Sequence, residues 1–221
     1  MVAYDLRPCS IEVVRALCEE HHGYASAGRV AVYAFAVYED GRPVAAYAWQ
    51  PPPPGAARSV CPEQPAGVLA LSRMVAVPRA DRRLNHVSRP LRRQMRRLID
   101  RGRWPVLVTY HDEGQGHTGH VYMCSGWTKT TRRTAAVYVD GTGARVSRYA
   151  NGREDKAGKT RQGSTVIQRW EHWACDVGSV CDHMRRSGWH RAPVIGKVWR
   201  SGAQAYSWRR APAQLPLWVA Q

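Results

Sequence analysis

Several features common in other protein classes are scarce in this sequence. The 221 residues include one Phe and six Cys, and only 17 Asp or Glu stand against 33 Lys or Arg. No apolar run approaches the length of about 18 residues that a membrane helix needs, so we expect no membrane contact. The cysteines are too dispersed for a disulfide scaffold, and the first residues lack the basic and apolar regions of a signal peptide. We therefore expect a cytoplasmic protein.

Two familiar active-site motifs are absent or incomplete. The sequence holds no G-x-S-x-G, and nothing in it forms a Ser–His–Asp signature. The run Gly158-Lys159-Thr160 resembles the end of a phosphate-binding loop, but the first glycine of that pattern and a preceding buried strand are missing. We therefore do not interpret this run as a P-loop.

A zinc site near the C-terminal end is an open alternative. Four soft ligands of the kind that structural zinc takes lie close together, at His172, Cys175, Cys181 and His183. Their spacing matches no standard zinc-finger pattern. The other interpretation is that the two cysteines are inert thiols and the two histidines lie on the surface.

Positive charge is what the sequence has in excess. The formal net charge is +16, and most of the basic residues are Arg, which binds phosphate through a planar fork and stacks on bases. Nine Trp and ten Tyr add large aromatic side chains with a polar group, which suit binding surfaces that are partly exposed to water. A polyanion such as DNA is the partner that this balance favours, although high-GC coding also raises the Arg content.

The first half of the chain predicts alternating helices and strands. Residues 10–20 have the apolar spacing of a short helix capped by Ser10, and residues 30–50 form two Val- and Tyr-rich runs around a turn at 39–42. We expect an irregular excursion over 51–67, a buried strand over 68–77, a helix over 81–101 and a second buried strand from Trp104. The order from 68 to 109 predicts a crossover unit, which places ligands at the N-terminal end of its helix.

The second half is less regular. We expect a strand over 134–139, a turn over 140–143 and a partner strand over 144–149, followed by a mobile basic loop over 151–164. The Trp- and Arg-rich remainder shows little periodicity. We therefore predict a catalytic domain over 1–150 and a basic extension over 151–221 that packs on it and contacts DNA.

The predicted helix over 81–101 carries two candidate anion sites. At its start, free N–H groups beside Arg79, Arg82 and Arg83 would suit a pyrophosphate. Farther along, one face holds Arg92, Arg93, Arg96 and Arg97. This face is either simply solvated or a contact for the DNA backbone.

The stretch from Trp104 to Trp127 is the candidate active site. Its apolar strand breaks into a glycine-rich loop that holds Tyr110, His111, Asp112, Glu113, His117 and His120. Asp112 is a candidate base and Tyr122 a candidate acid or hydrogen-bond donor, because burial can shift a pKa into the useful range. Alternatively, His111, His117 and Asp112 would bind a divalent metal, or the loop is merely a polar turn.

Two runs in this part of the chain carry a family resemblance. LSRMVAVP (71–78), then Asn85, Ser88 and Arg89 at a helix start, and TYHDEGQGHTGHVYMCSGW (109–127) resemble the Mom family of phage DNA-modification proteins. The matching positions of the second run are Tyr110, Asp112, Gly116, His117, Gly119, Tyr122 and Trp127. The resemblance covers about residues 20–135.

The resemblance implies a fold and an activity. The fold is a divergent GNAT acyltransferase, α/β with a mixed, splayed central sheet and helices on both sides. The activity is transfer of a carbamoylmethyl or related acyl-derived group to the exocyclic amine of adenine in double-stranded DNA, which protects phage DNA from restriction in the host cytoplasm. Acetyl-CoA or a related acyl-CoA and Fe(II) are the implied cofactors, and monomer and dimer both stay open.

Site residues follow from the resemblance together with the chemistry above. We expect Asp112, Tyr122, His117 and Tyr110 to be catalytic. The expected cofactor contacts are Ser88, Arg89, Arg73, Arg79, Arg82 and Arg83. The expected metal ligands are His22, Asp112 and His117, and the expected DNA contacts are Arg92, Arg93, Arg96, Arg97, Trp127, Arg132 and Arg133.

The sequence also departs from the resembled pattern. His111 stands where a small residue is expected, and PRADRRLNHVS (78–88) holds no glycine where a GNAT pyrophosphate loop is glycine-rich. Two other functions stay open. One is an N-acetyltransferase that acts on another amine or hypermodified base, and the other is a basic DNA-binding protein without catalysis.

Overall fold

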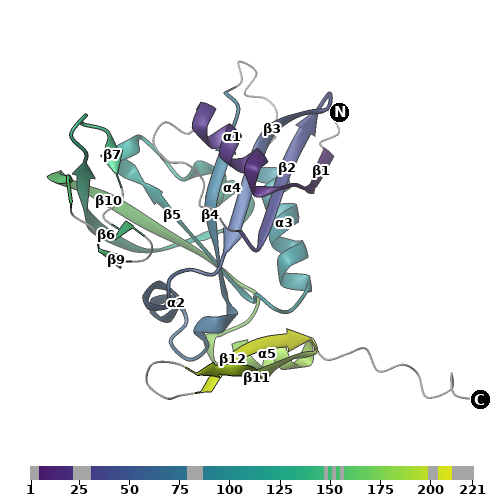
Figure 1. Cartoon of the computed structure of the whole chain (residues 1–221). Coiled ribbons are helices and arrows are strands. Elements are labelled where there is room, and N and C mark those ends of the chain that lie inside the picture. Colours follow the sequence, from purple (N-terminus) through teal and green to yellow (C-terminus); the bar gives the residue numbers. More distant parts are fainter. Residues whose placement is uncertain are drawn as a thin grey trace, which may run out of the picture.

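The central element of the computed structural model is an eight-stranded mixed sheet (Figure 1). The structure describes residues 5–21, 31–78, 87–146, 149–150, 153–154, 157–198 and 204–210. In sheet order the strands are β1 (Asp5–Pro8), β2 (Tyr33–Glu39), β3 (Arg42–Gln50), β4 (Val68–Ala76), β5 (Val106–Asp112), β10 (Thr160–Trp173), β6 (Thr128–Val139) and β7 (Arg145–Val146). Two further antiparallel pairs are β8 (Tyr149–Ala150) with β9 (Arg153–Glu154), and β11 (Trp189–Val198) with β12 (Gln204–Arg210).

Helices cover both faces of this sheet. They are α1 (Ile11–His21), α2 (Pro54–Val60), α3 (Ser88–Asp100), α4 (His120–Ser125) and α5 (Val180–Arg186), with single 3-10 turns η1 (Pro65–Gly67), η2 (Glu113–Gln115) and η3 (Val177–Ser179). Successive β3 side chains point to opposite faces, so Ala46 and Ala48 pack with α1 while Tyr47 and Trp49 pack with α3. No helix in the described residues is long and apolar enough to cross a membrane.

The two strands at the centre of the sheet separate soon after they meet. β4 and β5 run parallel, but only Val68–Ala70 pair with Val106–Val108. Beyond these three pairs β4 continues with β3, while β5 continues antiparallel to β10. The helix α3 connects β4 to β5, which confirms the predicted crossover. The predicted GNAT-like fold, a mixed and splayed sheet with helices on both sides, is therefore confirmed.

Local predictions in the first half are largely confirmed. The helix over 10–20 is α1, and the hairpin is β2–β3, whose turn has positive φ angles of 47° at Asp40 and 76° at Gly41. The excursion over 51–67 was expected to be irregular, but it contains α2 and η1, because prolines at the first position of each helix preset the backbone. Of the helix predicted over 81–101, α3 is the described part, and residues 79–86 lie outside the described residues.

The strand β10 corrects the interpretation of the second half. Residues 151–164 were predicted to be a mobile loop, yet β10 begins at Thr160 and lies between β5 and β6. Gly163, with φ of 109°, sits at a register shift in the β10–β6 pairing, and such a bulge interrupts the regular strand pattern in the sequence. Residues 160–173 are therefore part of the main sheet, although they were assigned to the extension. The partner strand predicted over 144–149 contributes only β7.

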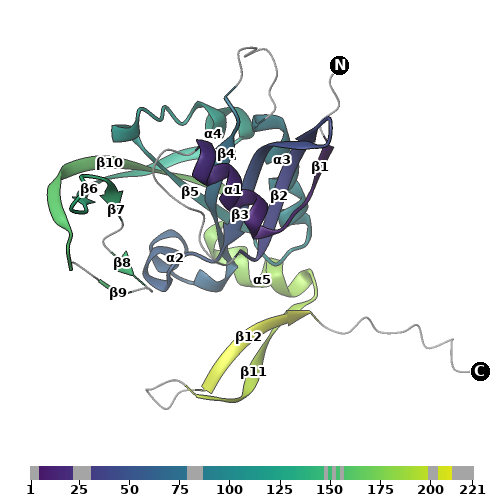
Figure 2. The ribbon, with the colours of Figure 1, turned by 45° about the horizontal axis from the view of Figure 1, so that its top comes forward.

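The hairpin β11–β12 lies apart from the sheet, below it in Figures 1 and 2. Arg103 anchors it. Its guanidinium lies 3.9 Å from the ring centre of Trp104 and 5.8 Å from those of Trp189 and Trp208. Burial lowers the pKa of Arg103 to about 10. The indole N–H of Trp189 also donates to the carbonyl of Arg101 over 2.9 Å, so tryptophans at the base of the hairpin fix it to the loop after α3.

Candidate active site

A cavity of about 500 Å³ lies where β4 and β5 separate. Its walls are residues 71–76 of β4, residues 109–112 of β5, the segment 116–122 and His21. The four residues predicted to be catalytic, Asp112, Tyr122, His117 and Tyr110, all line it. The parting of the strands thus brings together side chains from the end of β5, the following loop and α4.

The carboxylate of Asp112 is buried at the end of β5 and is held by two hydrogen bonds and one ion pair. Its Oδ1 accepts from the backbone N–H of Gly114 over 3.0 Å and from the hydroxyl of Thr165, and its Oδ2 pairs with the guanidinium of Arg145. Thr165 comes from β10 and Arg145 from β7. A carboxylate has about four acceptor positions, so this one is oriented by its neighbours and keeps acceptor capacity for a ligand.

His111 and Tyr122 form an aromatic wall together with Trp170. The rings of His111 and Tyr122 are stacked at 6.3 Å, with 10° between their planes, and the ring of Trp170 lies 5.8 Å from each. The indole N–H of Trp170 donates to Nδ1 of His111 over 2.8 Å. Burial lowers the pKa of His111. Tyr122 is 7% exposed, so its hydroxyl works within a largely dry environment.

Tyr110 and His117 differ in their surroundings. Tyr110 is half-buried, and burial is the main cause that raises the pKa of its phenol, against the opposing effect of Arg169 and Arg133. His117 is exposed at the rim of the cavity. Its place suits contact with an incoming substrate better than chemistry in a dry interior.

The opening between β4 and β5 has a second side. A smaller cavity of about 360 Å³ on the side of α2 is lined by Pro52, Pro53 and Arg145, and it shares residues 71–73 and 110–112 with the first. Both cavities therefore meet at the same part of β4 and at Asp112. Two ligands have room to approach this point from different sides.

The predicted cofactor residues divide into three groups. Arg73 lines both cavities. Ser88 and Arg89 begin α3 but line neither cavity, and the carbonyl of Ser88 accepts from the hydroxyl of Ser125 in α4 over 3.1 Å. The three remaining arginines, Arg79, Arg82 and Arg83, lie outside the described residues.

The residues present do not fit the predicted metal site. Within the described part of the chain, no three His, Cys, Asp or Glu side chains are grouped to hold a metal ion. Asp112 and His117 therefore have no third ligand of this kind beside them in the described part of the chain, and His22 lies outside it. The zinc alternative finds no grouping either: His172 places Nδ1 2.8 Å from the carbonyl of Gly126, and both Cys175 and Cys181 are free thiols.

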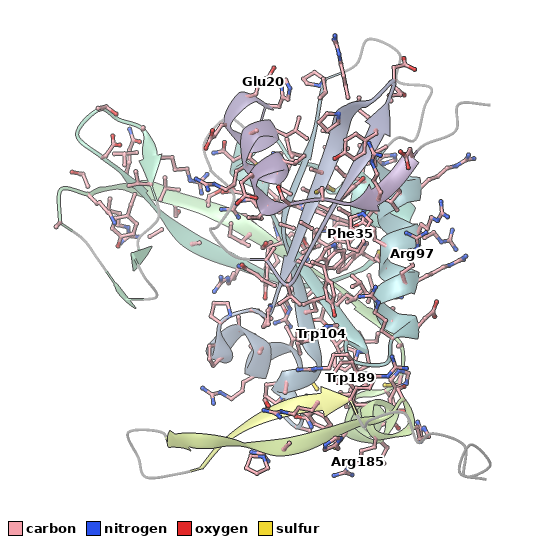
Figure 3. The ribbon with its side chains drawn as sticks, turned by 45° about the vertical axis from the view of Figure 1, so that its right-hand side comes forward. Glu20, Phe35, Arg97, Trp104, Arg185 and Trp189 are labelled. Atoms are coloured by element: carbon pink, nitrogen blue, oxygen red, sulfur yellow. The ribbon has the colours of Figure 1, made fainter. Side chains whose placement is uncertain are left out.

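The predicted DNA contacts are partly exposed and partly buried. The arginines on α3 at positions 92, 93, 96 and 97 are all exposed, and Figure 3 shows Arg97 pointing outward from the helix. Arg133 is exposed as well, whereas Arg132 forms a two-pronged ion pair with Glu113 at 2.5 and 3.1 Å. Trp127 is only 4% exposed and stacks on Trp49, because it closes the core beneath α4. It is therefore a core residue rather than a surface contact for DNA.

Sequence reasoning missed the residues that support Asp112 and His111. Arg145, Thr165 and Trp170 lie at least 33 positions after Asp112 and reach the site only because β10 inserts beside β5. The β-branched and aromatic content of residues 165–170 was the available signal for that strand.

Gly119 belongs to the glycine-rich loop and matches the resembled family, and the geometry explains why a glycine stands there. Its φ is +71°, and a Cβ there would lie 2.5 Å from Trp170 and 2.6 Å from His111. A side chain at this position would therefore push α4 away from His111 and Trp170.

Comparison with solved structures finds N-acetyltransferases at low identity. The ribosomal-protein-S18-alanine N-acetyltransferase from Escherichia coli is 12% identical, with a TM-score of 0.48, and the match covers 76% of this chain and 92% of that one. An N-acetyltransferase from Staphylococcus aureus Mu50 is 11% identical, with a TM-score of 0.48 and coverage of 79% and 100%. An agmatine N-acetyltransferase mutant is 13% identical, with a TM-score of 0.48 and coverage of 77% and 99%.

Comparison by sequence gives a family. No curated protein matches the chain. The model of the Mom protein family, in contrast, matches residues 3–176, which span β4, β5, α4 and the whole aromatic wall of the cavity. Since the match extends over more than half of the 221 residues, the chain belongs to the Mom protein family.

Proposed function

We propose that this protein is an enzyme that transfers an acyl-derived group to the exocyclic amine of adenine in double-stranded DNA. The observation that carries this proposal is the convergence of Asp112 and Tyr122 on one cavity in a chain of the Mom protein family. Binding to DNA alone does not require a cavity lined by an oriented carboxylate and a phenol. The group added, carbamoylmethyl or another, is part of the proposal.

The cavity has features that fit an acyl-CoA. Residues 71–76 of β4 pair with β3 on one side, and their other edge faces the opening beside β5. An open strand edge offers backbone N–H and C=O groups to an extended amide chain such as the pantetheine arm. Arg73 adds a cation at the same wall. When bound, the acyl-CoA would supply an acyl carbon activated as a thioester.

The side chains of the site have separate roles in this proposal. Asp112, oriented by Arg145 and Thr165, accepts a hydrogen bond from the adenine amine and turns its nitrogen toward the acyl group. Tyr122 donates from α4 to the acyl carrier. For transfer of an acyl group from a thioester, the Asp112 carboxylate would take the proton that the amine loses, and the phenol of Tyr122 would supply the proton that the departing thiol gains.

The charge distribution supports duplex DNA as the substrate. The chain carries 16 more basic than acidic residues, and four exposed arginines lie on one face of α3. Within the described residues none of these four pairs with a carboxylate, so they remain available to phosphates. An amine engaged in base pairing is reached by extruding its base from the duplex, and the cavity receives it.

Nucleoside mass spectrometry tests this function directly. Plasmid DNA is isolated from cells that express wild-type protein, Asp112→Asn or Glu113→Gln. Glu113 is the matched control, because it is the neighbouring carboxylate but pairs with Arg132 outside the cavity. We expect a modified deoxyadenosine with wild type and Glu113→Gln, and a loss of at least about 100-fold with Asp112→Asn, the size expected for a group that assists proton transfer.

The other outcomes discriminate the alternatives. If the modification were found on another base or on a small amine, the proposed group transfer would stand and the proposed adenine substrate would be wrong. Unmodified DNA from all three strains, with folded protein that still binds duplex DNA, would contradict the proposal and favour a binding protein. Plasmid that carries the modification should also resist restriction enzymes whose sites contain the altered adenine.

A further inference from the structure

We propose that His111 is a catalytic hydrogen-bond donor of this cavity, which Trp170 holds in its Nε2–H form and which donates to the carbonyl oxygen of the acyl group. The identity of this ligand rests on the proposed function. The state of the imidazole does not, because it follows from the contacts of the ring.

The hydrogen bond from Trp170 decides where the imidazole carries its proton. An indole Nε1–H is a donor only, so Nδ1 of His111, 2.8 Å away, must present its lone pair. A neutral imidazole whose Nδ1 accepts carries its hydrogen on Nε2. Trp170 is 3% exposed and His111 5%, so water has little opportunity to replace either partner.

Packing keeps the ring in this orientation. The ring of Tyr122 is stacked nearly parallel to it, and the ring of Trp170 lies against it at an angle of 41°. Gly119 closes the remaining side so tightly that an added Cβ would lie 2.7 Å from Nδ1. A half-turn of the imidazole would bring Cδ2 to the position of Nδ1 and break the bond to Trp170.

The charges around His111 also act on its protonation. Burial is the largest influence and lowers its pKa, and the cation of Lys129 and the nearby His117 act in the same direction. The carboxylates of Glu113 and Asp112 oppose them. A second proton, on Nδ1, would in addition point at the N–H of Trp170. Geometry and environment therefore both keep the imidazole neutral at pH 7.

The remaining nitrogen, Nε2, is the one that a ligand can use. Within the described residues Nε2 makes no hydrogen bond, while His111 lines both cavities at the point where they meet. Since His111 lines the cavities, an oxygen of a bound ligand can accept from this nitrogen. A neutral single donor suits a carbonyl oxygen, on which negative charge develops during acyl transfer.

Nitrogen NMR of the histidine side chains tests the state of the ring. At pH 7 we expect His111 of the wild-type protein to give the signals of the Nε2–H tautomer. In Trp170→Phe, which keeps an aromatic ring but lacks the donor, we expect a mixture of tautomers and a higher pKa for His111. An Nδ1–H tautomer in wild type, or spectra that do not respond to Trp170→Phe, would overturn the inference.

A pair of ligands tests the donor role. Acetyl-CoA has the carbonyl, and its thioether analogue S-ethyl-CoA lacks it. We expect calorimetry to show that wild type binds acetyl-CoA about tenfold more tightly, the effect of one hydrogen bond. His111→Leu should reduce this ratio to about one, and His111→Gln, which retains an N–H donor, should restore part of it. An unchanged ratio in a folded His111→Leu protein would contradict the proposal.

The two proposals can fail separately. If DNA remains unmodified but acetyl-CoA and S-ethyl-CoA are discriminated through His111, the adenine substrate is wrong and the donor stands. If adenine is modified at an unchanged rate by His111→Leu, the function stands and the donor role is wrong.

Discussion

Gly119 fixes the distance between α4 and the wall formed by His111 and Trp170. Its backbone is left-handed, and its missing side chain is what allows the close approach. Gly116 has almost the same φ, +72°, but a Cβ there would meet nothing within 4 Å. The two glycines therefore separate the cost of backbone strain from the cost of crowding.

For Gly119→Ala we expect a loss of about 2–5 kcal/mol in the free energy of unfolding, from left-handed strain plus overpacking. For Gly116→Ala we expect only the strain, about 1–2 kcal/mol. Urea unfolding of both variants measures the difference. Equal losses would show that the wall around His111 yields easily, which would also weaken the argument that its ring is fixed.

The helix α3 is the element in which sequence and structure agree most closely. Its apolar stripe, Leu91, Met95 and Leu98, is buried in the core, as the spacing of apolar residues predicted. The opposite face carries the four exposed arginines. Because this face is not needed for packing and Ala is the best helix former, it can be neutralised without unfolding the helix.

We expect the fourfold variant Arg92→Ala, Arg93→Ala, Arg96→Ala, Arg97→Ala to bind duplex DNA more weakly and with less salt dependence. If all four contact phosphates, the slope of log K against log salt should become smaller by about 3–4, since each phosphate contact contributes about 0.9. Fluorescence anisotropy titrations between low and moderate salt concentrations measure this slope. Arg42→Ala with Arg58→Ala, two exposed arginines on β3 and α2, is the control. If the control lowers the slope as much as the fourfold variant does, α3 is not the DNA-binding face.

At the scale of the whole molecule, the buried neutral His111 couples stability to pH. Its folded-state pKa lies below the ordinary value of 6.5, so below pH 6.5 the unfolded chain binds the proton more readily than the folded protein. The free energy of unfolding should therefore fall as the pH drops from about 6.5 toward the folded-state pKa.

We expect His111→Gln to remove this part of the pH dependence, whereas His190→Gln, on the exposed strand β11, should leave it in place. Denaturant unfolding between pH 5 and pH 8 gives the comparison. A wild-type stability that does not respond to pH in this range, or one that responds equally in His111→Gln, would show that His111 is not held neutral by the fold.

The elements that depend only on nearby residues could be predicted from the sequence. The turn at Asp40-Gly41, the apolar stripe of α3, and the strand and glycine-rich loop around Asp112 each depend on neighbours a few positions away, so periodicity and turn chemistry were sufficient to predict them. The family resemblance added the splayed sheet, which spacing alone did not show.

Only the tertiary structure decided which side chains surround the site. β10 takes its place between β5 and β6 through backbone hydrogen bonds to both, a cause that no local pattern contains, and it brings Thr165 to Asp112 and Trp170 to His111. The tertiary structure also places Trp127 in the core, where it stacks on Trp49. Residue types identified the chemistry near Asp112, but long-range strand pairing fixed the protonation of His111 and the partners of the carboxylate.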